Sequence, residues 1–200
     1  VAQAKELITA GIALAPKSAD FHFYLANLLV TEGALEEGIG SFRTALSIDP
    51  NHRQALANLG TALHSIGDLE SAVDHFERAI SLGPEDPAVH CNLAATLLAQ
   101  GRLDAGIQHY RTAITMNPEL AEAHCHLATT LQAQGKLDEA IEHYRLAVSS
   151  KPDFADALSN LGTTLQAKGR LNEAAEFLQR ALKVDENHFA AHNNLGNVFH

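Results

Sequence analysis

The chain has 200 residues, a formal net charge of −10, 46% hydrophobic residues and no tryptophan. A chain this acidic lacks the basic surface that neutralises phosphates, so we expect no nucleic-acid partner. No apolar stretch approaches the roughly 20 residues of a spanning helix and no signal-peptide pattern stands at the start, so we expect no membrane insertion. Two cysteines, Cys91 and Cys125, are too few for a disulfide framework. They indicate a reducing compartment, and we expect a cytoplasmic location.

A period of 34 residues organises the sequence, which is the signature of a repeat architecture. Prolines recur at this spacing, at Pro16, Pro50, Pro84, Pro118 and Pro152. Glycines recur in the same register, at Gly33, Gly67, Gly101, Gly135 and Gly169, and each is followed two residues later by leucine. Two helix-breaking residue types that share one period predict a series of equivalent units.

The predicted elements follow this period along the chain. Residues 1–18 hold the second helix of a half-unit, and residues 189–200 hold the first helix of another. Between them lie five full units, residues 19–52, 53–86, 87–120, 121–154 and 155–188. We interpret the two half-units as the ends of an excerpt from a longer protein. Apolar residues near both ends then predict end-to-end self-association; they are Leu7, Ile8, Leu195, Val198 and Phe199.

Each full unit is predicted to be two antiparallel helices joined at its glycine. In residues 53–86, one apolar stripe with helical spacing ends at Gly67, and a second ends at the Gly83-Pro84 pair. Small residues recur where the two helices of a pair must approach, at Ala26, Gly60, Ala94, Ala128, Gly162 and Gly196 on the first helix. Large side chains are expected to fill the gap from the second helix, at Phe42, Phe76, Tyr110, Tyr144 and Leu178, with Phe177 beside the last.

The pattern of Leu-Gly/Ala, turn glycine, Ala-aromatic-Ala and terminal proline resembles the tetratricopeptide repeat family. The resemblance covers the whole chain and implies an all-α, right-handed solenoid whose first helices line a concave groove. One position departs from the family, because the early aromatic site holds His22, Leu56, His90, His124, Leu158 and His192. Packing at that site is therefore expected to be polar or aliphatic.

The sequence predicts no catalytic site. It contains no nucleophile elbow, phosphate-binding glycine loop, metal-binding H-E-x-x-H or C-x-x-C motif. His124 and His126 flank Cys125, but residues two apart on a helix diverge, so we predict no metal site. The histidines at 75, 109 and 143 are expected on the outer surface. We predict two free thiols and no cofactor.

Asparagine recurs at one position of the first helices, directly before the Leu-Gly/Ala pair. The residues are Asn58, Asn92, Asn160 and Asn194, while Tyr24 and His126 occupy the same slot in the other two units. An amide offers both a hydrogen-bond donor and an acceptor, so such a row can hold an extended peptide backbone without reading its side chains. In the alternative, each asparagine has a structural role only and packs against the neighbouring helix. The row resembles the asparagine ladder in the repeat domain of O-linked N-acetylglucosamine transferases and their bacterial relatives.

We therefore predict a protein-interaction scaffold that binds extended peptide in its concave groove and is not itself an enzyme. The alternative is the substrate-selecting region of a larger protein O-glycosyltransferase, or other transferase, whose catalytic domain lies outside this chain.

Overall fold

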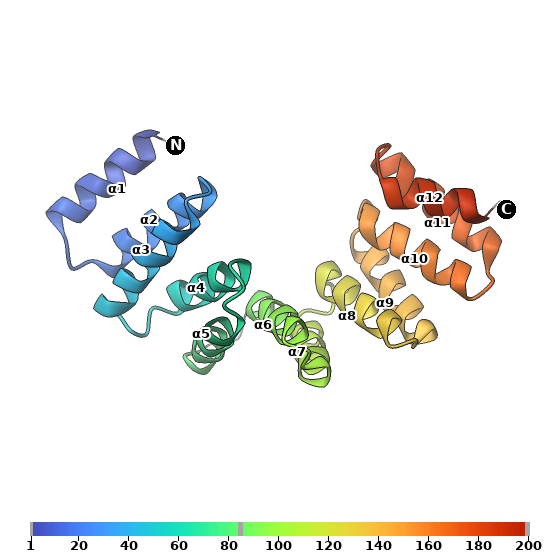
Figure 1. Ribbon diagram of the computed structural model, residues 1–200, viewed down its shortest axis with the longest axis horizontal. Coiled ribbons are helices and arrows are strands. Elements are labelled where there is room, and N and C mark those ends of the chain that lie inside the picture. Colours follow the sequence, from blue (N-terminus) through green and yellow to red (C-terminus); the bar gives the residue numbers. More distant parts are fainter. Residues whose placement is uncertain (1, 84–85, 199–200) are drawn as a thin grey trace. The chain divides into compact units, whose positions relative to one another are not determined.

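The computed structural model describes residues 2–83 and 86–198, and within these ranges the chain forms twelve helices and no strand (Figure 1). Pro84 and Phe199, which the sequence analysis singled out, lie outside the described residues. The helices, in chain order, are α1 (Ala2–Leu14), α2 (Ala19–Thr31), α3 (Leu35–Ile48), α4 (Arg53–Ser65), α5 (Leu69–Ser81), α6 (Pro87–Ala99), α7 (Leu103–Met116), α8 (Ala121–Ala133), α9 (Leu137–Ser150), α10 (Ala155–Ala167), α11 (Leu171–Val184) and α12 (Phe189–Val198). The predicted all-α class is confirmed.

The helices group into two compact units, residues 1–109 and residues 110–200, and α7 contributes to both. In the first unit each helix packs on the next in the chain, and α4 also contacts α2 and α6. In the second unit the same arrangement holds, with α10 in contact with α8 and α12. Each unit therefore carries a layer of even-numbered helices, and the predicted asparagine row lies on these helices.

Glycine ends the first helix of each pair in the left-handed region of backbone space. Gly67 has φ = 82°, and the Asp68 N–H donates back to the Leu63 carbonyl at 3.0 Å while the Gly67 N–H donates to His64. These two hydrogen bonds satisfy carbonyl groups that would otherwise lack a donor at the end of the helix. The same geometry recurs at Gly33, Gly101, Gly135 and Gly169, whose φ angles lie between 73° and 84°. The predicted turns are thereby confirmed.

A large side chain from the second helix of each pair fills the space against the first helix. Phe42, Phe76, Tyr110, Tyr144 and Leu178 are all at most 2% exposed. A Cβ placed on Gly60 would lie 2.9 Å from the Phe76 ring, and one on Gly162 would lie 2.6 Å from Leu178. The predicted close approach is thus confirmed at these positions. At Gly196 the prediction is not tested, because the described residues include no second helix after α12, and a Cβ there meets nothing within 4 Å.

Leu178 alone fills the gap of the last pair, and the neighbouring Phe177 lies outside it. Phe177 is half-buried, and the Arg180 guanidinium stands 5.1 Å from its ring centroid. The ring therefore covers the helix surface and supports a cation–π contact, which is worth about 0.5–1 kcal/mol at exposed sites.

Histidines at the early aromatic site anchor the loop that precedes their helix. The His124 Nε2–H donates to the Pro118 carbonyl at 3.0 Å, and His22 and His192 contact the carbonyls of Pro16 and Glu186 in the same way. The Nδ1 atom of His124 then accepts from Nδ1–H of His143 at 2.9 Å. At these positions, a hydrogen bond between the helix and the preceding loop therefore takes the place of the aromatic side chain that is typical of the family.

Two of the histidines expected on the outer surface instead reach across their helix pair. His109 contacts His90 through their Nδ1 atoms at 3.0 Å, and His143 contacts His124 as described. Both His109 and His143 are half-buried. Burial lowers the pKa of each, and the neighbouring histidine lowers it further. His75 is also half-buried and contacts the Ser71 carbonyl.

We predict that replacing Gly67 by Ala lowers the free energy of unfolding by about 1–2 kcal/mol, because a Cβ is strained at positive φ. Gly40 provides the matched control: it is exposed inside α3, and a Cβ there meets nothing within 4 Å. Gly40→Ala should raise stability by about 0.5–1 kcal/mol. Urea unfolding measures both, and equal effects of the two substitutions would refute the turn assignment.

We also predict acid sensitivity from the paired histidines. The folded-state pKa values of His109 and His143 lie below the unfolded value of about 6.5, so the unfolded chain binds more protons and stability falls as pH drops below that value. The unfolding free energy should decrease between about pH 7.5 and pH 5.5, and His109→Gln with His143→Gln should flatten that decrease. The same slope in parent and variant would contradict this cause.

Candidate functional site

The residues predicted to bind peptide all lie on even-numbered helices, and each unit of the structure holds three of them. Tyr24, Asn58 and Asn92 lie on α2, α4 and α6 of the first unit, while His126, Asn160 and Asn194 lie on α8, α10 and α12 of the second. Contacts join α4 to its two neighbours and α10 to its two neighbours. Within each unit the three residues therefore come from adjacent helices.

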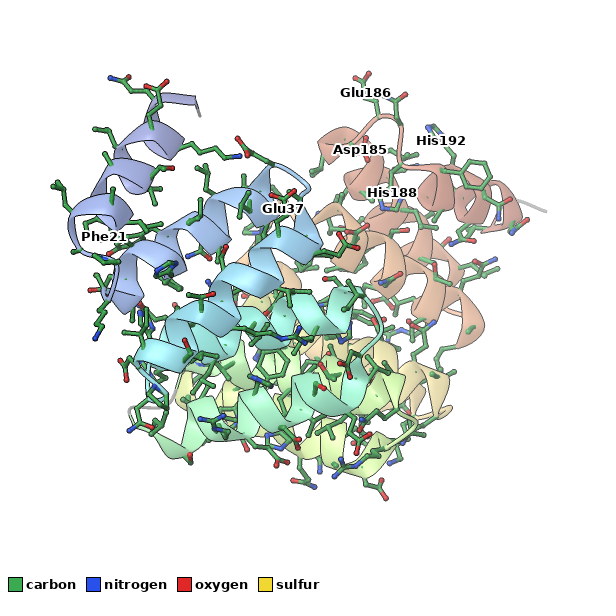
Figure 2. The ribbon with its side chains drawn as sticks, turned by 60° about the vertical axis from the view of Figure 1, so that its left-hand side comes forward. Phe21, Glu37, Asp185, Glu186, His188 and His192 are labelled. Atoms are coloured by element: carbon green, nitrogen blue, oxygen red, sulfur yellow. The ribbon has the colours of Figure 1, made fainter. Side chains whose placement is uncertain are left out.

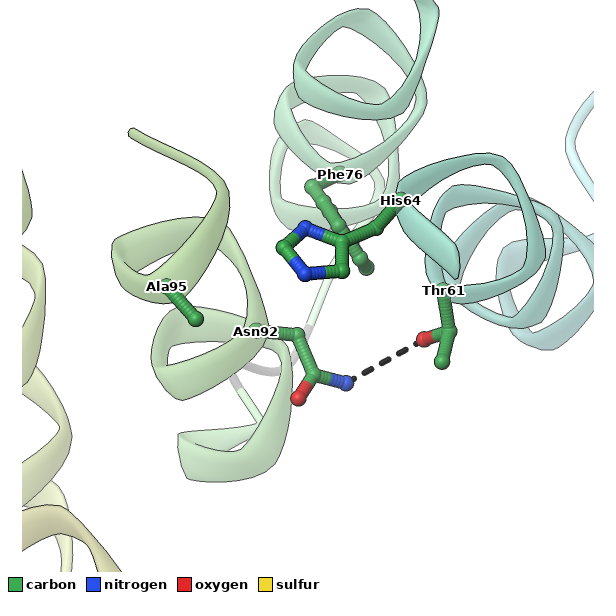
Figure 3. A pocket seen from close by; sticks show the side chains of 5 residues that line it. All are labelled: Thr61, His64, Phe76, Asn92 and Ala95. Atoms are coloured by element: carbon green, nitrogen blue, oxygen red, sulfur yellow. Dashed lines mark hydrogen bonds between the residues drawn. The ribbon is translucent and has the colours of Figure 1, made fainter. Parts of the chain in front are cut away.

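Three of the four asparagines donate a hydrogen bond to the preceding helix of the same layer. Asn58 Nδ2 donates to Asn27 Oδ1 at 2.6 Å and Asn92 Nδ2 donates to Thr61 Oγ1 at 3.2 Å, the second of which is drawn in Figure 3. In the second unit, Asn194 Nδ2 donates to Thr163 Oγ1 at 2.7 Å. Each bond spans 31 residues. These asparagines therefore do contact the neighbouring helix, as the alternative interpretation of the sequence proposed.

Each of these bonds uses one amide hydrogen and leaves the rest of the amide available. Within the described ranges, the Oδ1 atoms of Asn58, Asn92 and Asn194 accept no hydrogen bond from the protein. Because an amide oxygen has two lone pairs and the nitrogen a second hydrogen, each side chain keeps both donor and acceptor capacity. The cross-helix bond fixes the amide plane and leaves this capacity unused within the described residues.

Asn160 makes no such bond with the helix before it. The equivalent hydroxyl belongs to Thr129, which contacts the Tyr144 hydroxyl at 2.9 Å and donates to the Cys125 carbonyl at 3.0 Å. Thr61 and Thr163 do accept a bond from an asparagine of the row. In their helix pairs the second helix carries Phe76 or Leu178 in place of Tyr144, and neither side chain has a hydroxyl. The half-buried Asn160 amide therefore has no side-chain partner among the described residues.

The two aromatic members of the row sit against other rings. Tyr24 is 53% exposed, with its ring centroid 5.5 Å from that of Phe23. The His126 ring stacks on Tyr110 at 5.8 Å, with an angle of 21° between the planes. Although His126 is partly exposed, covering one side of the imidazole desolvates it and lowers its pKa, which Glu122 partly opposes. Both residues therefore present flat, partly apolar surfaces.

Sequence reasoning missed the acceptors of the asparagine bonds. Asn27, Thr61 and Thr163 stand three residues after the row position of their own helix, and Thr129 occupies the same place on α8. These small polar residues are spaced by 34 or 68, so the signal was present in the repeat register. This spacing cannot be interpreted as a set of hydrogen-bond acceptors until it is known that helices one period apart pack against each other.

Two cavities lie beside the row in the first unit, one period apart. The larger, about 200 Å³, opens between α2, α3 and α4, and its lining includes Asn27, Val30, Phe42, Asn58 and Thr61. The smaller, about 80 Å³, is lined by Thr61, His64, Phe76, Asn92 and Ala95 (Figure 3). Adding 34 to the five named residues of the first gives those of the second. No Asp, Glu, Lys or Arg lines either cavity.

The thiol and imidazole groups of α8 do not converge on a common point. His124 is buried against Pro118 and His143, whereas His126 lies on Tyr110. Cys125 is buried, and that burial raises the pKa of its thiol to about 11, so it stays protonated and unreactive. Cys91 and Cys125 form no disulfide.

Charged side chains form ion pairs away from the row. Lys151 pairs with Glu122 at 3.1 Å, and Lys168 pairs with Asp138 at 2.9 Å. Arg170 and Arg145 both contact the Glu173 carboxylate, which holds the pKa of Glu173 below its usual value. The Lys168–Asp138 and Arg145–Glu173 pairs connect successive helix pairs, whereas the other two lie within one predicted unit. Figure 2 draws the side chains on the ribbon and labels Asp185, Glu186 and His188 in the turn between α11 and α12. No helix among the described residues is long and apolar enough to cross a membrane.

Tetratricopeptide repeat models match the chain over most of its length. One matches residues 1–53 and 91–155, a second matches residues 131–196, and a model described as TPR repeat matches residues 60–101. A curated relative, protein O-mannosyl-transferase TMTC1 of Homo sapiens, is 40% identical over 57 residues. That match covers 28% of this chain and 6% of the relative.

Solved structures share the fold over nearly the whole chain. YrrB, described as a TPR protein with an unusual peptide-binding site, is 26% identical with a TM-score of 0.72, covering 95% of this chain and 98% of that one. MamA is 26% identical with a TM-score of 0.72, covering 81% of this chain and 95% of that one. PilF of Pseudomonas aeruginosa has a TM-score of 0.85 at 21% identity, over 98% of this chain and 89% of that one.

We predict that Asn58 and Asn160 differ in their effect on stability. Asn58→Ala leaves the half-buried Asn27 amide without its donor, which costs about 0.5–1.5 kcal/mol before the better helix propensity of Ala is counted. Asn160→Ala breaks no side-chain bond and should leave the unfolding free energy unchanged or raise it slightly. Urea unfolding of the two variants tests this, and equal losses would contradict the hydrogen-bond pattern.

Proposed function

The chain belongs to the tetratricopeptide repeat family, a fold of protein-interaction scaffolds, and from this premise we propose that it binds extended peptide along its asparagine-bearing helices. The proposed binding residues are Tyr24, Asn58 and Asn92 in the first unit and His126, Asn160 and Asn194 in the second. They lie on the helices that the family resemblance assigns to the concave groove. One such residue comes from each proposed repeat unit and from the last helix.

The observation that carries this proposal is the orientation of the amides. A free asparagine side chain rotates, and ordering it on binding costs free energy. The bonds of Asn58, Asn92 and Asn194 to the preceding helix remove that cost before any ligand arrives. The unused oxygen and second hydrogen match the N–H and C=O of a peptide backbone, which repeat in an extended chain.

The uncharged linings of the two cavities support a peptide held by its backbone rather than by terminal charges. Capture of a C-terminal carboxylate requires Lys or Arg beside the row, and the cavities contain neither. Apolar floors from Phe42 and Phe76 beside polar amides resemble the general composition of ligand sites, which are mostly apolar with a few placed polar groups.

We do not extend the proposal to a catalytic role. The sequence raised a substrate-selecting region of a larger transferase as the alternative, but no contact or cavity in the described residues favours a sugar or nucleotide over a peptide.

Self-association through the apolar residues near the two ends of the chain stays a prediction. Leu7 on α1 is 67% exposed, and light scattering of a Leu7→Glu variant at high concentration tests whether its surface joins two copies.

We predict that Asn58→Ala combined with Asn92→Ala weakens peptide binding by about 1–3 kcal/mol, or about 5- to 150-fold, because two backbone hydrogen-bonded pairs are lost. Asn160→Ala alone should weaken binding by about 2- to 13-fold without loss of stability, because its amide has no structural partner. The probe is a fluorescein-labelled peptide selected from a random phage-displayed library, measured by fluorescence anisotropy.

The matched control is Asn172→Ala, the same chemical change at an exposed position of α11 outside the row. It should leave affinity unchanged. Arg78 is a poorer control because its guanidinium donates to the Pro50 carbonyl at 3.0 Å and thereby fixes a loop. If Asn160→Ala binds as tightly as the parent and the double variant changes only stability, the row is structural and the proposal fails.

A further inference from the structure

The two cavities of the first unit occupy equivalent places but differ in one wall. In the larger cavity that wall is Val30, beside Leu35, Phe42 and Ala62, and the rest of the lining is polar and includes Thr31 and Ser65. In the smaller cavity, 34 residues later, the same wall is His64. An apolar side chain thus faces one space and an imidazole faces the next.

Hydrogen bonding fixes which nitrogen of His64 is available. The Thr96 hydroxyl donates its single hydrogen to the Asn92 carbonyl at 2.7 Å. The contact of 3.0 Å between Thr96 Oγ1 and His64 Nδ1 therefore has Nδ1–H as the donor. The lone pair of the neutral imidazole is then on Nε2, for which no protein donor exists among the described residues.

The smaller cavity consequently offers a hydrogen-bond acceptor, His64 Nε2, to whatever enters it, while the Asn92 nitrogen is directed to Thr61 (Figure 3). The volume of about 80 Å³ admits a group of a few heavy atoms. A short side chain that carries a hydroxyl hydrogen satisfies both the size and the acceptor. Serine and threonine have this chemistry.

The spacing of the cavities selects a backbone conformation. Packed helices lie about 8–10 Å apart, so equivalent cavities on successive helices of one layer are separated by a similar distance. A polyproline II chain has three residues per turn and advances about 9 Å per turn, which places residues i and i+3 on the same side. In a β-strand, residues three apart point to opposite faces.

We propose that the first unit reads a polyproline II peptide with an aliphatic residue in the Val30 cavity and serine or threonine, three residues away, in the His64 cavity. This inference rests on the proposed function, because the asparagine amides hold the backbone. Polyproline II has no internal backbone hydrogen bonds, so its N–H and C=O groups are open to Asn58 and Asn92. The row therefore supplies affinity and the two cavities supply sequence preference.

The test uses threonine and valine, which have nearly the same shape and differ in one hydroxyl. The probes are fluorescein-labelled, proline-rich peptides with leucine at one position and threonine or valine three residues away, in both orders. Wild-type protein should bind the better threonine peptide about 2- to 13-fold more tightly than its valine counterpart, as expected for one neutral hydrogen bond. His64→Val should abolish or reverse this preference.

Three further arms separate the possible failures. His64→Gln retains an acceptor and should keep part of the threonine preference, while circular dichroism verifies that each variant is helical. Asn92→Ala should weaken both peptides and leave their ratio unchanged. Peptides with the two residues two or four apart should lose the gain from the second cavity.

If His64→Val shows the same threonine-to-valine ratio as the wild type while Asn92→Ala still weakens binding, the cavity inference is overturned and the proposed function stands. If neither proline-rich peptide binds while the phage-selected peptide is still weakened by Asn58→Ala with Asn92→Ala, this inference is overturned and the proposed function stands; if the phage-selected peptide is not weakened either, both fail. A ratio that depends on His64, with affinity that depends on Asn92, supports both.

Discussion

The fit of one large side chain against one small residue across each helix pair sets the spacing on which the rest of the structure depends. Where Gly60 meets Phe76, not even a methyl group fits without displacing the ring. Burial of such a ring contributes about 1.5–3 kcal/mol, and the close approach it requires fixes how far apart the two helices lie. Because the same pairing recurs every 34 residues, successive first helices within each unit are brought into one layer at a constant separation.

That constant separation explains why a residue of the row meets a hydroxyl or amide three positions after the row slot of the preceding helix. The bond exists at Asn27, Thr61 and Thr163, and it is absent at Asn160, where the equivalent Thr129 contacts a Tyr144 hydroxyl that itself donates to Gln132. The row is regular in sequence, yet its members are unequal in their freedom to bind.

The period alone was enough to predict the helix pairs, the glycine turns and the buried rings, because each depends on neighbours within a unit. The histidine pairs and the asparagine bonds could not be predicted, because they join residues whose contact depends on side-chain direction across a packed interface. His109 illustrates the difference: its spacing placed it beside the core ring, but only the structure shows that it reaches His90.

A hydrogen bond within the protein and a role in binding are often treated as competing explanations for a polar residue that recurs in each repeat. For an amide the two roles are complementary. The group has two donor hydrogens and an acceptor oxygen, and one cross-helix bond uses only one of these. The bond lowers the entropy that a ligand must otherwise remove, so it strengthens later binding through the remaining atoms. A serine or threonine in the same slot has a single hydrogen and, after donating it internally, retains acceptor capacity alone. Asparagine at the row position therefore allows a helix layer to be tied together and still leaves both a donor and an acceptor for a peptide backbone.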